Sequence, residues 1–352
     1  MPPDIVRPRK GKIPVLILFG PTASGKTALL EELFIPKNIK GFMNPPYRAE
    51  IISADSMQVY QGMDIGTAKP PPEIRALIPH HLIDIKSPAD QFNAGEFVRL
   101  AKKAIRSAAK NNALPVVSGG TGFYIKNLVQ GLPASPPSDL FIRTDLKNEL
   151  TEYGSSRLME ELAEKDPVSA AKIHPNDTYR LLRALEVLRQ TGLPLSSFMP
   201  NESGTRRSGN SAFRFLILGL KREREELYRR INERCAQMFR DGLAEEVRHF
   251  FDIGYTPNDP GMRAIGYREF FVKTENPGKI YPEYTFSNDF EGVEAQIAGN
   301  SRRYAKRQMV FFASLPNAVW IEETDPAKAA EEIKEKLDQF LISSPPRQKS
   351  SL

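Results

Sequence analysis

The sequence feature that most constrains the fold is a glycine-rich loop between an apolar run and a helix-like run. Residues 20–27 read Gly-Pro-Thr-Ala-Ser-Gly-Lys-Thr and match the pattern G-x-x-x-x-G-K-[ST]. The apolar residues 15–19 precede this loop, and the helix-like residues 28–34 follow it. Backbone N–H groups in such a loop point at an anion, and the positive N-terminal end of the next helix strengthens the attraction. The pattern therefore predicts a site for a compound that carries at least a diphosphate.

Two side chains of this phosphate loop have specific expected roles. Lys26 supplies a point charge for the phosphates, and the hydroxyl of Thr27 is a candidate ligand for Mg²⁺. The motif leaves open which phosphate compound binds and whether a phosphoryl group is transferred. The predicted diphosphate-binding residues are Gly20, Pro21, Thr22, Ala23, Ser24, Gly25, Lys26 and Thr27.

Composition excludes several classes of protein. Cys235 is the only cysteine, so an internal disulfide and a cysteine-based metal cluster are excluded, and the four histidines lack zinc-binding spacing. Cys235 falls on an apolar pattern of helical period, which predicts a small core residue. No apolar run approaches the roughly 20 residues that span a bilayer, and no signal-peptide core is present, so we expect a cytoplasmic protein without membrane contact. The net charge of +6 favours nucleic acid only weakly, but basic clusters in the C-terminal half indicate a polyanionic partner.

Short apolar runs alternate with helix-like stretches along most of the chain. This alternation predicts a parallel sheet with helices on both faces and ligands at the carboxyl ends of its strands. Residues 140–162 and 179–188 instead read as helices without an intervening strand, which predicts a helical insertion. The expected strands are residues 15–19, 50–53, 81–85, 114–117, 213–220 and 318–321. The expected domains are a catalytic core at 13–133 and 206–342, a helical insertion at 134–205, and disordered tails at 1–12 and 343–352.

Two further strand ends carry candidate site residues. Asp55 follows the second predicted strand, at the edge where the phosphate loop also opens, and is a candidate general base. The fourth predicted strand ends in two glycines followed by Thr121, which offers a hydroxyl and an N–H group to an anion. Many nucleoside triphosphatases have an acidic residue at the end of such a strand, where it holds Mg²⁺. This strand lacks one, so the usual set of residues for phosphoryl transfer is incomplete. Residues 62–70 form a loop rich in glycine, threonine and lysine, and the residues by themselves indicate no role for it.

Taken together, several blocks of the sequence closely resemble the tRNA dimethylallyltransferase family. The blocks are GPTASGKT at 20–27, ISADSMQVYQGMDIGTAKP at 52–70, SGGTGFYIKNLVQGLP at 118–133, IHPNDTYRLLRALEV at 173–187, GMRAIGYREF at 261–270 and RRYAKRQMVFF at 302–312. The resemblance implies an α/β fold with a P-loop NTPase-like parallel sheet flanked by helices and an inserted all-helical tRNA-binding domain. It also implies that a prenyl group passes from dimethylallyl diphosphate to N6 of the adenosine immediately 3′ of the anticodon. The implied partners are Mg²⁺ and the anticodon stem-loop of tRNA, and we expect the chain to act as a monomer.

The resemblance also implies roles for individual residues. Asp55 would engage the adenine amino proton, while Thr121 and Arg263 would contact the diphosphate, which makes these three residues the expected catalytic set. The expected tRNA-binding residues are Asp55, Ser56, Met57, Gln58, Thr121, Arg143, Arg180, Arg183 and Gln308. The chain departs from many bacterial members in its longer connection at 35–48 and in the sequence Ser-Met-Gln-Val at 56–59.

Three other functions compete with this interpretation. An adenylate isopentenyltransferase, which prenylates a free nucleotide, needs no helical insertion such as residues 134–205. A nucleotide or small-molecule kinase accounts for the phosphate loop but not for the other blocks. A phosphate-binding RNA module without activity has no need for Asp55, Lys26, Thr121 and Arg263, all of which are present.

Overall fold

The computed structural model describes residues 12–35, 47–132, 134–198, 212–274 and 283–342. The chain divides into two compact units, one formed by Met1–Val129 and Asn210–Leu352 and the other by Gln130–Gly209. Most of the expected disordered tails, at residues 1–12 and 343–352, lies outside the described residues.

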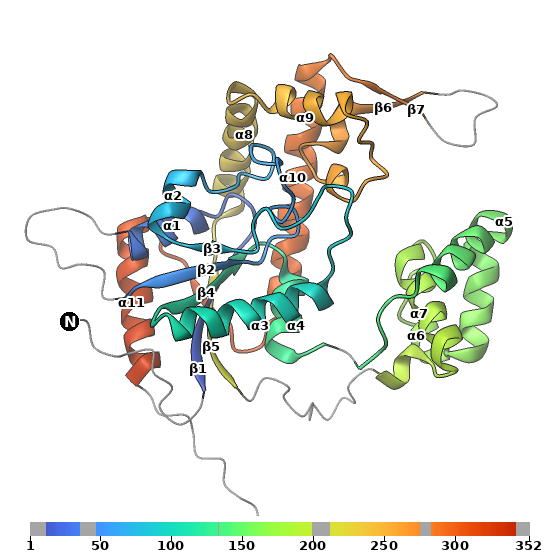
Figure 1. Ribbon diagram of the computed structural model, residues 1–352, viewed down its shortest axis with the longest axis horizontal. Coiled ribbons are helices and arrows are strands. Elements are labelled where there is room, and N and C mark those ends of the chain that lie inside the picture. Colours follow the sequence, from blue (N-terminus) through green and yellow to red (C-terminus); the bar gives the residue numbers. More distant parts are fainter. Residues whose placement is uncertain (1–11, 36–46, 133, 199–211, 275–282, 343–352) are drawn as a thin grey trace, which may run out of the picture. The chain divides into compact units, whose positions relative to one another are not determined.

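The first unit contains most of the helices and strands (Figure 1). Its strands are β1 (Ile13–Phe19), β2 (Ala49–Ser53), β3 (His80–His81), β4 (Leu114–Gly119), β5 (Phe213–Leu220), β6 (Phe271–Thr274), β7 (Glu283–Phe286) and β8 (Val319–Ile321). Its helices are α1 (Lys26–Phe34), α2 (Pro72–Leu77), α3 (Ala94–Lys110), α4 (Gly122–Gln130, which ends in the second unit), α8 (Arg224–Arg240), α9 (Leu243–Asp252), α10 (Phe290–Phe312) and α11 (Pro326–Ile342), with 3₁₀ turns at Gly261–Arg263 and Arg268–Phe270.

A six-stranded parallel sheet forms the centre of this unit, which confirms the predicted α/β fold. The strand order is β3-β2-β4-β1-β5-β8, and each pair of neighbours is parallel. Both faces of the sheet are buried, and β1 is apolar throughout. Val15, Ile17 and Phe19 pack into one buried cluster, whereas Leu16 and Leu18 pack into a second cluster with α1 and α11. Parallel strands end at one edge of a sheet, so the loops after β1, β2 and β4 meet there.

Two features of this unit differ from the sequence-based expectation. The strand expected over residues 81–85 is wrong beyond His81, because Leu82 and Asp84 adopt positive φ angles of 64° and 55°, which are incompatible with an extended strand. The antiparallel pair of β6 and β7 was not predicted. Its burial comes from contacts such as that between the rings of Phe251 and Phe286, whose centroids are 5.6 Å apart, and such contacts leave no local pattern.

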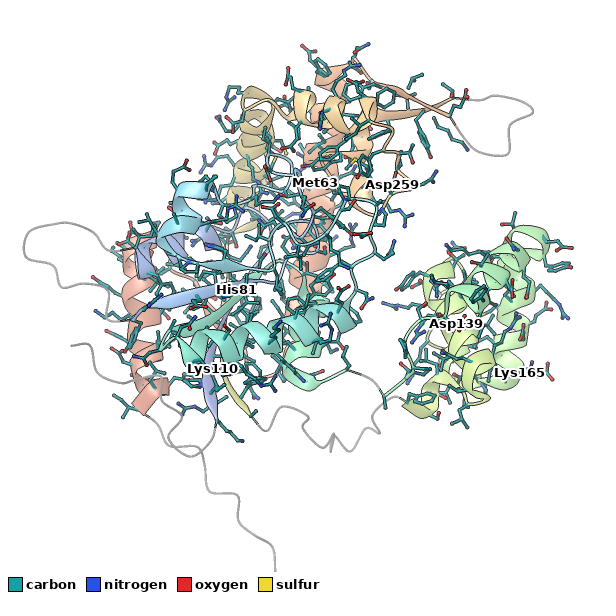
Figure 2. All side chains as sticks on the ribbon, in the orientation of Figure 1. Met63, His81, Lys110, Asp139, Lys165 and Asp259 are labelled. Carbon is teal, nitrogen blue, oxygen red and sulfur yellow. The ribbon has the colours of Figure 1, made fainter. Side chains whose placement is uncertain are left out.

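The second unit is helical in its described residues, as predicted. It consists of α5 (Leu140–Lys165), α6 (Pro167–Ala170), α7 (Thr178–Thr191) and a 3₁₀ turn at Leu195–Phe198. Gly154 interrupts α5 with a φ of 76°, which glycine adopts without the steric cost of a Cβ atom. Asp139, labelled in Figure 2, starts α5 by accepting hydrogen bonds from the backbone N–H groups of Phe141 and Ile142. The core of this unit comprises Leu146, Leu158, Leu162, Leu181, Leu182, Ala184 and Leu185.

Some expectations from composition can be compared with the described residues. Cys235 is a core residue with 3% of its surface exposed, as predicted. Among the described helices, none has both the length and the apolar character needed to cross a membrane. The described residues also contain no group of three or more His, Cys, Asp or Glu side chains arranged to hold a metal ion.

Candidate active site

The loops at the carboxyl edge of the sheet enclose a cavity of about 800 Å³, a size typical of small-molecule sites. Its wall includes the phosphate loop, the ends of β2 and β4, part of the 62–70 loop, and side chains of α8 and α10. The structure thus brings together side chains from several segments that are far apart in the sequence. The predicted site residues that line the cavity are Thr22, Ala23, Gly25, Lys26, Thr27, Asp55, Gln58 and Gln308.

The phosphate loop has features that suit an anionic ligand. Ala23 and Gly25 adopt φ angles of 61° and 97°, and α1 begins at Lys26 without a side-chain cap, which leaves its first N–H groups available to an anion. The Oγ atom of Ser24 is buried and has no hydrogen-bond partner among the described residues. Ser24 itself is not among the residues that line the cavity.

Lys26 is folded against its own loop. Its Nζ atom donates hydrogen bonds to the carbonyl oxygens of Gly20 and Pro21, at 2.9 and 2.8 Å. Burial and then the charge of Arg234 lower the pKa of Lys26 to about 8, whereas the charge of Asp55 opposes this shift. A negatively charged ligand in the cavity would favour the protonated lysine and raise this pKa again.

Two arginines that were not singled out from the sequence as site residues hold the phosphate loop from its carbonyl side. The Nε atom of Arg222, which follows β5, donates to the carbonyl oxygen of Ser24 at 3.2 Å. The Nε atom of Arg230, on α8, donates to the carbonyl oxygen of Ala23 at 2.9 Å. These bonds engage two loop carbonyl oxygens and occupy no loop N–H group.

Arg234 is a further cavity residue that was not predicted. It lies one helical turn after Arg230 on α8, lines the cavity, and donates through Nη1 to the Thr22 hydroxyl at 3.2 Å. Its charge acts on both Lys26 and Asp55. The four-residue spacing of Arg230 and Arg234 was the available sequence signal, because residues i and i+4 share one face of a helix.

Arg263, which was expected on the diphosphate, is not among the residues that line this cavity. It is the exposed residue of a 3₁₀ turn whose other two residues are buried, and its guanidinium donates to the carbonyl oxygens of Pro257 and Asn258. The structure therefore brings Arg234, and not Arg263, to the phosphate loop.

Asp55 is oriented by the turn that follows β2. Its Oδ1 atom accepts hydrogen bonds from the backbone N–H groups of Met57 and Gln58, at 2.8 and 3.3 Å. Its Oδ2 atom accepts no hydrogen bond from the described residues, so this oxygen is available to a ligand. The Thr121 hydroxyl supports the same turn, because it accepts a hydrogen bond from the Ser56 N–H group at 3.0 Å.

Gln308 on α10 connects two edges of the cavity. Its Oε1 atom accepts from the Thr22 N–H group at 2.9 Å, and its Nε2 atom donates to the Gly120 carbonyl oxygen at 2.7 Å. The adjacent Gly119 is required for close approach, since a Cβ atom there would lie 2.2 Å from the carbonyl oxygen of Ala54. Both hydrogen-bonding ends of the Gln308 amide are thus used to hold the site together.

Tyr304, one helical turn before Gln308, also lines the cavity. Burial and the nearby charge of Asp55 raise its pKa to about 12. The tyrosine is therefore a neutral phenol at physiological pH.

The expected tRNA-binding arginines of the second unit are of two kinds. Arg143 and Arg183 bind the Oε2 atom of Glu186 at 3.2 and 3.0 Å, and Glu186 is completely buried. The pair with Arg143 joins α5 to α7, whereas the pair with Arg183 lies within α7. Arg180 is different, because 69% of its side chain is exposed and its ion pair, with Asp177, is at the surface.

Comparisons with known proteins connect this arrangement to one family. The family model described as IPP transferase matches residues 58–315. The tRNA dimethylallyltransferases of Geobacter sulfurreducens and Geobacillus thermodenitrificans are 42% and 41% identical to the chain over 88% and 91% of its length, which corresponds to 92% and 94% of those proteins. The crystal structure of the tRNA isopentenylpyrophosphate transferase of Bacillus halodurans is 33% identical, with a TM-score of 0.60 over 94% of this chain and 97% of that one. A eukaryotic dimethylallyltransferase acting on tRNA, only 24% identical, shares the fold with a TM-score of 0.72 over 96% of this chain and 81% of that one. The phosphate loop, the cavity and these likenesses together show that the chain belongs to the IPP transferase family.

Proposed function

We propose that this chain transfers the dimethylallyl group of dimethylallyl diphosphate to N6 of the adenosine immediately 3′ of the anticodon in tRNA. Its relatives named tRNA dimethylallyltransferase support this activity. The single observation that carries the proposal is that the phosphate loop and the partner-free oxygen of Asp55 face one cavity. A site for a diphosphate and a site for proton abstraction are thereby combined.

The phosphate loop holds the diphosphate of the donor. The N–H groups at the start of α1 and the Lys26 ammonium are the donors available to its oxygens. Arg234 adds a positive charge beside the loop, where it binds the Thr22 hydroxyl. These groups are already in place before reaction, so they stabilise the negative charge that develops on the leaving diphosphate without reorganisation.

Asp55 acts as the general base. The lone pair of N6 attacks the allylic carbon of the donor, the bond from that carbon to the diphosphate oxygen breaks, and the diphosphate leaves. Oδ2 of Asp55 accepts the proton that N6 loses. The adenine amine is a weak nucleophile because its lone pair is delocalised into the ring, so general-base assistance of this kind contributes about 10²–10⁴-fold.

The site also fits Mg²⁺ carried in with the diphosphate. Thr27 exposes a hydroxyl oxygen at the cavity, and Mg²⁺ is commonly held by one or two protein oxygens together with substrate phosphates. When bound, the ion would neutralise part of the leaving-group charge.

The helical second unit is the proposed contact for the anticodon stem-loop. Arg180 offers an exposed guanidinium for a phosphate, whereas Arg143 joins α5 to α7 through Glu186, and Arg183 pairs with Glu186 within α7. Ser56, Met57 and Gln58, in the Asp55 turn, are the residues proposed to surround the acceptor adenosine. That adenosine can leave its stack at modest cost because it lies in a single-stranded loop.

A labelled-donor assay distinguishes this function from its competitors. The protein is incubated with isotope-labelled dimethylallyl diphosphate and Mg²⁺, with either tRNA or AMP as acceptor, with and without ATP. We expect label in one adenosine of the tRNA, equimolar diphosphate, and no requirement for ATP. Label in AMP would identify an adenylate isopentenyltransferase, and ADP formed from ATP would identify a kinase. The Asp55→Asn variant, which keeps the size of the side chain, serves as the matched control and should transfer label about 10²-fold more slowly.

A further inference from the structure

The 62–70 loop is held from outside the cavity by one carboxylate. Glu246, on α9, accepts hydrogen bonds at Oε2 from the backbone N–H groups of Asp64 and Ile65, at 2.9 and 2.8 Å. Its Oε1 atom accepts from the Gly66 N–H group at 3.2 Å and from the Tyr267 hydroxyl. Three of these four donors belong to a loop about 180 positions away in sequence. Hydrogen bonds to a charged acceptor are roughly twice as strong as those between neutral groups.

Packing reinforces this anchor. A Cβ atom at Gly66 would lie 2.4 Å from the ring of Tyr267, so the loop rests directly on that buried ring. Gly266, with a φ of 101°, also approaches Gly66, and a Cβ atom at Gly266 would be 3.5 Å from the Gly66 carbonyl oxygen. The position of residues 64–66 is thus set jointly by Glu246 and Tyr267.

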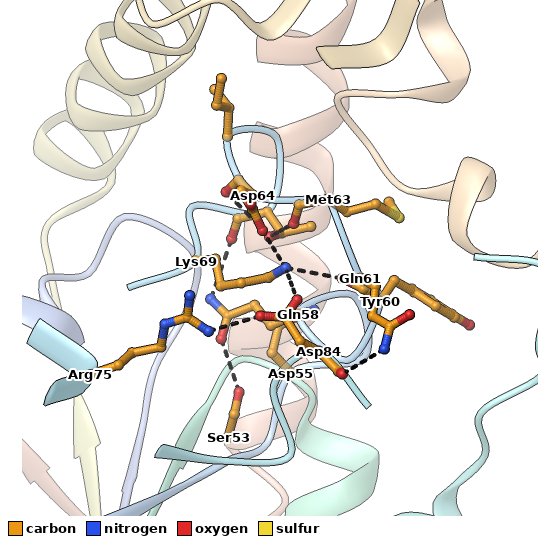
Figure 3. Close-up of polar contacts among 12 residues, drawn as sticks. Ser53, Asp55, Gln58, Tyr60, Gln61, Met63, Asp64, Lys69, Arg75 and Asp84 are labelled. Atoms are coloured by element: carbon orange, nitrogen blue, oxygen red, sulfur yellow. Dashed lines mark hydrogen bonds and ion pairs between the residues drawn. The ribbon is translucent and has the colours of Figure 1, made fainter. Parts of the chain in front are cut away.

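The C-terminal end of the 62–70 loop is held by separate ion pairs and hydrogen bonds, which Figure 3 shows. The Nζ atom of Lys69, whose side chain is 2% exposed, forms ion pairs with Asp64 and Asp84 and donates to the Tyr60 carbonyl oxygen at 3.0 Å. Arg75 completes the cluster through Asp84 at 2.8 Å. The N–H groups of residues 64–66, however, are satisfied by Glu246 and not by this cluster.

The anchored loop is connected to the catalytic carboxylate through Gln58. The Nε2 atom of Gln58 donates to the carbonyl oxygens of Thr67 and Ala68, at 3.3 and 3.2 Å, and its Oε1 atom accepts from the Ser53 hydroxyl at 2.9 Å. The backbone N–H group of the same residue donates to Oδ1 of Asp55. Figure 3 shows Gln58 between Ser53 and the loop, with Asp55 close by. A continuous series of bonds and covalent links thus joins Glu246 to Asp55.

We infer that Glu246 is a positioning residue, which holds the 62–70 loop so that Gln58 keeps the Asp55 carboxylate in its productive orientation. This inference rests on the proposed function, in which Asp55 is the base. The diphosphate cradle is held by other bonds, those of Arg222, Arg230 and Gln308. Loss of Glu246 therefore lowers the rate of the chemical step and leaves donor binding nearly unchanged.

The test compares Glu246→Gln with Glu245→Gln, a matched change at the adjacent exposed carboxylate of α9. The amide introduced at position 246 presents an NH₂ group where a carboxylate oxygen had accepted bonds, so at least one loop N–H group loses its partner. We expect kcat to fall about 10- to 100-fold, as misplacement of a reacting group by about 1 Å does. The KM for dimethylallyl diphosphate should stay within about twofold, and Glu245→Gln should match the parent.

Two further measurements separate positioning from general destabilisation. In an Asp55→Asn background, Glu246→Gln should change kcat by less than about twofold, because residues that act through one another are not additive. Hydrogen exchange at the N–H groups of residues 64–66 should accelerate in Glu246→Gln but not in Glu245→Gln, which is measurable without any activity. Tyr267→Phe, which removes one donor and leaves the carboxylate, should give a smaller loss of kcat and provides the comparison if Glu246→Gln does not fold.

Defined results would overturn the inference. A kcat for Glu246→Gln within twofold of Glu245→Gln, or a full additional loss in the Asp55→Asn background, would show that Glu246 does not act through Asp55. Unchanged exchange at residues 64–66 would show that the carboxylate does not hold the loop. By contrast, a parent protein that transfers no label to tRNA would refute the proposed function, while the exchange comparison would still decide whether Glu246 anchors the loop.

Discussion

Replacing Arg234 by alanine tests whether this arginine, and not Arg263, serves the diphosphate. The change removes a half-buried positive charge that lies in the cavity wall and binds the Thr22 hydroxyl. Loss of one preorganised donor at a developing negative charge typically costs about 10²–10³ in kcat, or about 3–4 kcal/mol. We therefore expect Arg234→Ala to lower kcat by about that factor, and Arg263→Ala to lower it by less than about tenfold.

The same substitution has a second consequence, for pH dependence. Burial and the charge of Arg234 lower the pKa of Lys26 to about 8. In the parent protein, Lys26 therefore loses its proton as the pH rises through about 8, and the diphosphate of the substrate then loses a positively charged partner. The KM for dimethylallyl diphosphate should rise across that range. Removal of Arg234 takes away the second cause of the depression while burial remains, so the rise should move to higher pH.

Steady-state rates with labelled dimethylallyl diphosphate and saturating tRNA, between pH 7 and about pH 10, give both kcat and the KM for dimethylallyl diphosphate. The matched control is Arg229→Ala on the same helix, because Arg229 is exposed and pairs with Glu226 at 2.8 Å and with Glu233 at 2.5 Å. The assignment of Arg234 to the diphosphate fails if Arg234→Ala retains kcat within about threefold of Arg229→Ala. It also fails if the pH at which KM rises is the same in both variants.

Other predictions concern the base, the second unit and one close contact. Asp55→Asn should lower turnover by about 10²-fold or more with tRNA affinity within a few-fold, measured by single turnover and filter binding; near-normal turnover would remove Asp55 from the mechanism. Glu186→Ala leaves Arg143 and Arg183 without their buried partner and should destabilise the helical unit by about 3–5 kcal/mol. Faster hydrogen exchange in α5 and α7 of the full chain would show this loss, whereas Glu164→Ala, at an exposed position, should have little effect. Arg180→Ala should reduce the salt dependence of tRNA binding by about one unit of slope, and an unchanged slope relative to Arg157→Ala, a similarly exposed arginine of α5, would exclude a phosphate contact. Gly66→Ala forces a Cβ atom against the Tyr267 ring and should cost about 1–3 kcal/mol of stability by thermal unfolding, with Gly299→Ala, where the nearest atom lies 3.8 Å from the added Cβ, as the control.

Much of the architecture could be predicted because its causes are local. The apolar run before residue 20 and the glycine pattern after it are enough to predict a strand, a turn with N–H groups facing an anion, and a helix. Alternation of apolar and helix-like runs predicts the parallel sheet, and the strand ends then place Asp55 at the same edge as the phosphate loop. The helical period of residues 140–162 and 179–188 likewise predicts α5 and α7.

The tertiary structure alone decided which distant side chains complete the site. Arg234, Gln308 and Glu246 each act on a loop about 180 or more positions away, and nothing in their local sequence states which loop that is. A helical period specifies the buried face of a helix, but the partner of that face depends on how the whole sheet and its helices pack. For this reason Arg263, which lies within a motif block, was expected at the diphosphate, while the structure brings Arg234 to the phosphate loop from the face of α8. The sequence thus determined most strands of the parallel sheet, the phosphate loop and the chemistry at the strand ends, and only packing decided which side chains from elsewhere in the chain orient that chemistry.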